Sequence, residues 1–175
     1  MEFYSLVFST IDLRSFASVW FWIGVAVAWS NMTHFIIGVP FDMVVRARRK
    51  GGLALDDLQA MAQIQARRRN QIMASSGVWL AGFWALVLTA LAILGFRFGA
   101  ELSQALTLLL APMTLAAALG LRLARKLETA PPDGAALIKT LLWHRFMIQG
   151  IGLLSILVTT MWGTVFNLSH MFVSP

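Results

Sequence analysis

The chain has 175 residues, of which 58% are hydrophobic and only 13% are charged. A soluble domain carries about 45–50% apolar and about 25% charged residues, so this balance excludes an ordinary soluble protein. The net charge of +6 would suggest nucleic-acid binding in a soluble chain. Here the basic residues lie beside apolar runs, so membrane topology explains them better. The absence of cysteine excludes disulfides and thiolate metal sites within the chain.

The first long apolar segment covers residues 16–39 and contains no Asp, Glu, Lys or Arg. A helix rises about 1.5 Å per residue, so about 20 residues cross a hydrocarbon core about 30 Å thick. We predict a transmembrane helix over this segment, ended by Gly38 and Pro40 and followed by a basic cluster at 46–50. Glu2 is the first charged residue, and no Lys or Arg comes before the first apolar residues, so the positive n-region of a signal peptide is missing. We therefore expect no cleavable signal peptide.

Residues 40–71 form a polar, basic connection. Within it, apolar residues recur at helical spacing, Asp56 and Asp57 come early, and arginines 67–69 come late. Acidic residues at the start and basic residues at the end complement the helix dipole. We predict an amphipathic cytoplasmic helix over 53–70, which either lies on the membrane surface or extends the second span.

Three further apolar segments are long enough to cross a membrane, at 72–96, 102–121 and 146–166. A second connection, 122–145, separates the last two. The sequence therefore predicts an all-α integral membrane protein that forms one domain over residues 1–175, with four transmembrane helices.

The distribution of basic residues predicts the orientation. The connections 40–71 and 122–145 hold all of the Lys and Arg residues except Arg14 and Arg97. Loops rich in Lys and Arg stay in the cytoplasm. We therefore expect a multi-pass protein of the bacterial inner membrane with both termini on the periplasmic side.

Small residues recur at four-residue spacing along three predicted spans, where they share one helix face. Such a stripe lets two helices approach closely in lipid. Asn31, in the first span, is a polar group suited to bonding with a neighbouring helix. The predicted helix-packing or partner interface consists of Gly77, Ala81, Ala85, Ala116, Gly120, Ser155, Thr159, Gly163 and Asn31.

The two connections also predict a cytoplasmic basic patch. It consists of Arg46, Arg48, Arg49, Lys50, Arg67, Arg68, Arg69, Arg122, Arg125 and Lys126. Contact with membrane lipid headgroups is the first interpretation, and docking of an acidic cytoplasmic protein is the second. No nucleic-acid partner is expected.

His34 and His144 are candidates for a cofactor pair. Each lies near the cytoplasmic end of a predicted span, so the two can reach a similar depth. Paired imidazoles on facing helices can hold a haem iron. The alternative is that His34 bonds to a neighbouring helix and His144 lies among headgroups. Trp29 and Trp84 lie deeper and could stack on a pigment or quinone, although packing is the commoner role.

The chain lacks a Gly-rich phosphate loop, an HExxH motif and any acidic residue inside a predicted span. Intramembrane carboxylates are the usual relays of transporters, so their absence argues against a secondary transporter. We expect a non-enzymatic accessory subunit or assembly factor that packs against a larger membrane complex or another copy of itself, with no resident cofactor or metal. The alternatives are a haem b- or quinone-binding electron carrier using His34 and His144, and a small oligomeric channel.

The N-terminal third of the chain resembles a known family. The run IDLRSF, a Trp-rich span and then GVPFDMVVRARR are similar to small bacterial membrane proteins of unknown activity, described as components of the SUF (SufBCD) iron–sulfur assembly complex. The resemblance covers residues 9–50 and implies an accessory role near cluster assembly. Without cysteine, this chain cannot itself ligate a cluster through thiolates.

Overall fold

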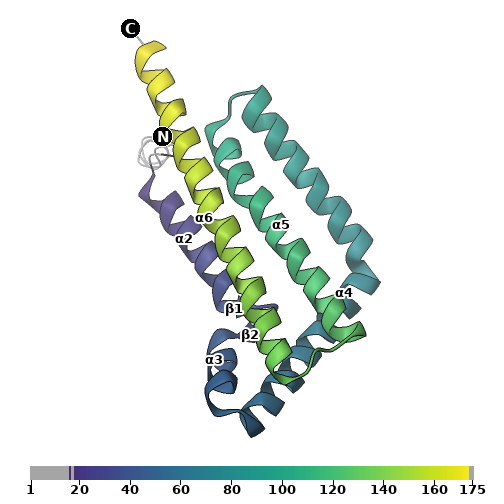
Figure 1. Cartoon of the computed structure of the whole chain (residues 1–175). Helices are drawn as coiled ribbons and strands as arrows, with labels where there is room; N and C mark the ends of the chain where they lie inside the picture. Colours follow the sequence, from purple (N-terminus) through teal and green to yellow (C-terminus); the bar gives the residue numbers. More distant parts are fainter. Residues whose placement is uncertain (1–15, 17, 174–175) are drawn as a thin grey trace, which may run out of the picture.

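The computed structural model describes residues 16 and 18–173, and it is helical apart from one short hairpin and the connecting turns. The elements in chain order are α2 (Val19–His34), β1 (Phe35–Ile36), β2 (Val39–Pro40), α3 (Phe41–Lys50), α4 (Gly52–Ala92), the π-helical turn η2 (Ile93–Arg97), α5 (Glu101–Thr129) and α6 (Gly134–Val173). Figure 1 shows α6 between α2 and α5, with α4 at the outer edge of the bundle. The all-α prediction is confirmed.

Three helices of the described chain are long and apolar enough to cross a membrane: Gly52–Arg97, Glu101–Thr129 and Gly134–Phe166. They contain the second, third and fourth predicted spans. Figure 1 shows the start of α2 and the end of α6 together, at the end of the molecule opposite α3. The two connections rich in Lys and Arg, residues 40–71 and 122–145, therefore lie at the end of the molecule that contains α3. We call this end the basic end.

The first predicted span is shorter as a helix than the sequence suggested. α2 has 16 residues and ends at His34, whereas the prediction continued the helix to residue 39. At about 1.5 Å per residue α2 is about 24 Å long, less than a hydrocarbon core of about 30 Å. The prediction that Gly38 and Pro40 end this helix was wrong, because the chain has already left the helix before it reaches them.

Residues 35–40 instead form a β-hairpin. Ile36 pairs with Val39, and the turn residues Ile37 and Gly38 have φ of 50° and 94°. Positive φ at both central residues is the pattern of type I′ hairpin turns. A β-branched residue rarely adopts that conformation, and here Ile37 is buried in the core around it. The hairpin reverses the chain and directs it into α3.

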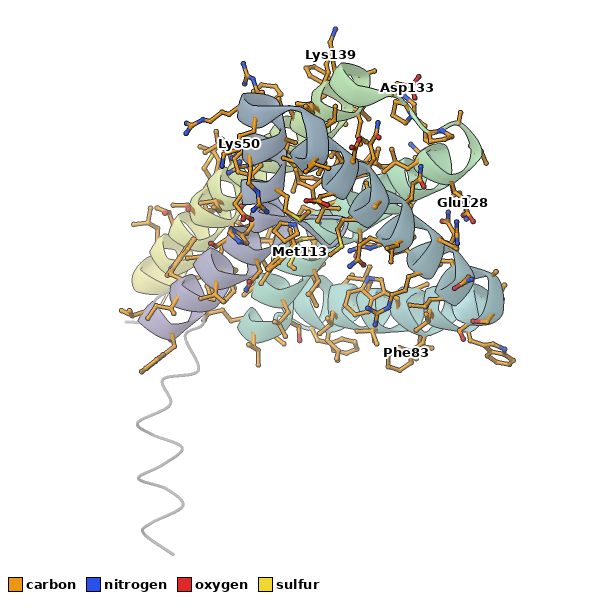
Figure 2. The ribbon with its side chains drawn as sticks, turned by 90° about the horizontal axis from the view of Figure 1, so that it is seen from below. Lys50, Phe83, Met113, Glu128, Asp133 and Lys139 are labelled. Carbon is orange, nitrogen blue, oxygen red and sulfur yellow. The ribbon has the colours of Figure 1, made fainter. Side chains whose placement is uncertain are left out.

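α4 joins the predicted amphipathic helix to the second span. It is one helix from Gly52 to Ala92, so residues 53–70 are continuous with the second predicted span and do not form a separate element. Figures 1 and 2 show that α4 changes direction, so that its first half crosses the basic end and its second half runs beside α5. Within α4, the Ser75 hydroxyl donates to the Ile72 carbonyl at 3.2 Å.

The main hydrophobic core lies at the basic end, where the hairpin, α3, the first half of α4 and parts of α5 and α6 meet. Its largest fully buried side chains are Val39, Val44, Leu58, Leu127 and Leu141. A smaller cluster joins α2, α5 and α6 farther along the bundle and contains Val25, Trp29, Ala116 and Ile148. The larger cluster therefore holds the basic end together, and the smaller one holds α2 against α5 and α6 along the bundle.

Candidate functional site

The second half of α4 exposes the apolar surface that is least covered by the rest of the chain. In the most apolar 18-residue stretch of α4 with η2, 6% of the stretch is buried, compared with 28% of the corresponding stretch of α6. Val78 and Trp79 are 87% and 83% exposed. Figure 2 shows Phe83 on the outer side of α4, pointing away from the other helices. Such a surface suits contact with lipid or with another apolar protein surface.

The small-residue stripe of α4 lies on this uncovered part of the helix. Ala81 and Ala85 are exposed. Gly77 is buried, but the side chain nearest to it is Met73, one turn earlier in the same helix. The stripe is therefore buried at Gly77 and exposed at Ala81 and Ala85.

The small-residue stripe of α6 packs inside the molecule. Ser155, Thr159 and Gly163 are all buried. The Ser155 hydroxyl donates to the Leu108 carbonyl of α5 at 3.3 Å. A Cβ at Gly163 would lie 2.9 Å from the side chain of Phe16, so no larger residue fits there without a shift. This stripe joins α6 to its neighbours within the chain.

The two small residues predicted for helix packing on α5, Ala116 and Gly120, also face inward. Ala116 is 2% exposed and packs in the cluster that contains Trp29. A Cβ at Gly120 would lie 3.4 Å from Nη1 of Arg69 and 3.6 Å from Ile37. Small side chains at these two positions let α2, the hairpin and α4 approach α5 closely.

Asn31 does not reach another helix in the described structure. Its side chain is exposed, and its amide Nδ2 donates to the Val27 carbonyl of the same helix at 3.1 Å. The two deep tryptophans differ in their surroundings. Trp29 packs its ring against Gly152 of α6, and the indole Nε1 of Trp84 donates to the Thr114 hydroxyl of α5 at 2.6 Å.

A polar bridge ties three helices at the end opposite the basic end. Gln104 is 5% exposed; its Nε2 donates to the Gly95 carbonyl at 2.9 Å, and its Oε1 accepts from Trp162 Nε1 at 2.9 Å. A Cβ at residue 95 would lie 2.7 Å from the Gln104 backbone nitrogen, so the site requires glycine. A lone Gln in an apolar segment indicates such a bond, but the sequence does not identify its partners.

The structure does not bring the imidazoles of His34 and His144 into contact in the described chain. His34 is exposed, and its ring meets the edge of Phe35 with centroids 4.8 Å apart. His144 is 6% exposed and lies just before the apolar segment 146–166. Burial, and secondly the charge of Arg69, lower the pKa of His144 below its ordinary value.

Arg69 differs from the other members of its run. Arg67 and Arg68 are exposed, whereas Arg69 is partly buried and burial lowers its pKa. No carboxylate pairs with Arg69 among the described residues. Arg145 is likewise turned into the protein, because its guanidinium lies over the Phe41 ring, 3.4 Å from the centroid. Cation–π contact of this kind holds α6 against α3.

The remaining basic residues cover the basic end without internal partners. The exposed members are Arg46, Arg48, Arg49, Lys50, Arg67, Arg68, Arg122, Arg125 and Lys126. None of them forms an ion pair with a carboxylate of the described chain. Figure 2 looks onto this end and shows Lys50 and Lys139 on it. The basic patch is therefore available to anions from outside the chain.

Comparison of the chain with protein-family models, with curated proteins and with solved structures finds no match. The family resemblance of residues 9–50 therefore stays a prediction.

Proposed function

We propose that the chain is a non-enzymatic integral membrane subunit in which α2, α4, α5 and α6 cross the bilayer and the basic end faces the cytoplasm. Three of these helices have the length and composition of membrane spans. Exposed side chains such as Trp79 and Phe83 would leave water on insertion, which is favourable by about 25 cal/mol per Å² of apolar surface. The clustering of Lys and Arg at one end supports the orientation.

The hairpin supports the proposal that α2, the first predicted span, also crosses the membrane despite its length. Non-helical backbone is tolerated near the membrane only where protein buries it. Ile36, Ile37 and Val39 are each at most 3% exposed, because α3 to α6 cover the hairpin. The short helix and the protected hairpin together would carry the chain from one face of the bilayer to the other.

The uncovered stripe of α4 carries the proposal that this subunit binds another membrane protein. Lipid tails are as apolar as leucine, so apolar exposure alone does not drive helices together in a bilayer. Small residues do favour close packing, and Ala81 and Ala85 are exposed in the described chain. We therefore assign this face to a larger membrane complex or a second copy of the chain. Iron–sulfur assembly proteins are the first cytoplasmic partners to test at the basic end, given the resemblance of residues 9–50.

The test is affinity purification in mild detergent from native membranes, followed by native mass measurement. Ala85→Leu should remove the associated protein or the second copy, because the larger side chain separates the two helices. Ala90→Leu is the matched control, since Ala90 is also exposed on α4 but lies on a different face. Recovery of the unaltered chain as a lone monomer, after cross-linking in the membrane, would contradict the proposal.

A further inference from the structure

A cavity of about 710 Å³ opens between α3 and the first turns of α6 at the basic end. Its apolar wall is formed by Ile138, Leu142, Trp143 and Phe146. Ile138, Leu142 and Phe146 are four residues apart, and Trp143 comes three residues before Phe146, so the four side chains lie on one side of α6. Trp143 and Phe146 stack with ring centroids 5.7 Å apart, yet both rings are more than 60% exposed. The described fold therefore leaves an aromatic and aliphatic wall open to the outside.

Two cations line the same cavity, Arg48 from α3 and Lys139 from α6, and no carboxylate lines it. Neither cation has an ion-pair partner in the described chain. Figure 2 shows Lys139 at the outer edge of the basic end. An anion can bind between these side chains without displacing an internal carboxylate.

The charged and apolar parts of the cavity follow each other along α6. Lys139 comes seven residues before Phe146, or about 10 Å along a helix axis. The apolar segment 146–166 begins at Phe146. On the same side of α6, Gly150 is exposed with open space where a Cβ would lie, and Leu153 is 72% exposed. A ligand with an anionic head and a long apolar tail matches this order.

We propose that the cavity binds one molecule of an anionic phospholipid. Its phosphate lies between Arg48 and Lys139, and an acyl chain follows Leu142, Trp143 and Phe146 toward the membrane centre. Basic pockets beside membrane helices on the cytoplasmic side have this ligand chemistry. The volume falls within the range of about 300–1,000 Å³ found for small-molecule sites. The inference rests on the proposed membrane orientation, but it does not require the protein partner assigned to α4.

Quenching of Trp143 fluorescence tests the site in the full chain reconstituted into phosphatidylcholine vesicles. Phosphatidylglycerol with brominated acyl chains is added in increasing proportion, and the Trp143→Phe variant identifies the part of the signal that comes from this indole. We expect that part to saturate at a low proportion of brominated phosphatidylglycerol and to respond much less to brominated phosphatidylcholine.

The Arg48→Gln/Lys139→Gln double variant should raise the half-saturating proportion of phosphatidylglycerol about thirtyfold. Each basic residue near the membrane surface contributes about fivefold to the binding of an anionic lipid, and the variant removes two of them. The matched control is Arg125→Gln/Lys126→Gln, which removes two exposed charges from α5 and should leave saturation unchanged. Circular dichroism verifies that both double variants keep their helical content.

Equal quenching by the two brominated lipids, or equal loss in the two double variants, would overturn the lipid site. Displacement by glycerol 3-phosphate would also overturn it, because the headgroup alone would then bind. Native mass could also reveal a dimer of the unaltered chain that is lost in the Arg48→Gln/Lys139→Gln variant. That result would overturn the lipid site, because a second copy would then occupy the cavity. A chain released from vesicles by alkaline wash would contradict the membrane proposal and the lipid site together. An inserted chain without a preference for phosphatidylglycerol would contradict only the site.

Discussion

The apolar halves of α4 and α6 carry the same kind of small-residue stripe and use it in opposite ways. In α6 the stripe from Ser155 to Gly163 is buried against α5 and Phe16. In α4 the residues Ala81 and Ala85 are exposed in the described chain. Figure 1 shows the reason, because α6 lies between two helices and α4 lies at the edge with α5 on one side only. A stripe indicates that a helix can be approached closely, and the neighbouring elements decide whether the same chain supplies the partner.

The largest expected effect comes from filling a close contact on α6. A Cβ at Gly152 would lie 2.9 Å from the Trp29 ring, so Gly152→Leu must move α2 away from α6. Overpacking of this kind costs about 1–3 kcal/mol, and a lower thermal midpoint in detergent would show it. Gly82→Leu on α4 is the control, because nothing lies within 4 Å of its Cβ position. Equal losses from both substitutions would contradict the difference between the two helices.

Removing the polar bridge between η2, α5 and α6 should have the next largest effect. Gln104→Leu leaves the Gly95 carbonyl and the Trp162 indole without their partner. We expect the free energy of unfolding to fall by about 1–2 kcal/mol, the size of effect found for hydrogen bonds between helices in membrane proteins. Thermal unfolding of Gln149→Leu, which changes an exposed glutamine of α6, provides the comparison and should match the unaltered chain. A stable Gln104→Leu variant would show that the bridge adds nothing.

A smaller, pH-dependent effect is expected where α4 and α6 meet at the basic end. Burial and the charge of Arg69 lower the pKa of His144 in the folded chain, whereas the unfolded chain keeps a pKa of about 6.5. The unfolded state therefore binds the proton first as the pH falls, so stability is kept above about pH 6.5 and is lost below it.

Thermal unfolding between pH 7.5 and 5 measures this loss. His144→Gln should flatten the pH dependence, and His34→Gln, which changes an exposed imidazole, should retain it. An unchanged pH profile in His144→Gln would show that another group is responsible.

The smallest effect is expected on the uncovered stripe itself. Ala85→Leu should change the stability of the isolated monomer by less than about 0.5 kcal/mol, as for other surface substitutions. The same variant is predicted above to lose its membrane partner, so association and stability should separate. A large fall in the thermal midpoint of the monomer would mean that this face is packed within the chain after all.

The features that the sequence predicts well are those set by local composition. The long apolar segments become α4, α5 and α6, and the clustered arginines lie at one end of the bundle. The hairpin at 35–40 is different, because an uninterrupted apolar run fits a buried helix or a buried turn equally well. The turn also places Ile37 at positive φ, which its side chain disfavours and only the surrounding core can maintain.

The roles of individual candidate residues depend on tertiary contacts that the pattern does not contain. Arg67, Arg68 and Arg69 are identical in sequence terms, yet only the third turns inward toward Gly120 and His144. The cavity beside α6 also depends on the position of α3, which supplies Arg48. Helical spacing identifies the faces of each element, and it does not identify which faces meet.

The continuity of α4 has a structural consequence. A single helix runs from the segment that crosses the basic end into the apolar half that carries the open stripe, with no loop between them. The two halves run in different directions, yet they share one continuous backbone. In the proposed membrane orientation, α4 would therefore connect the cytoplasmic end of the molecule directly to the exposed apolar surface within the bilayer.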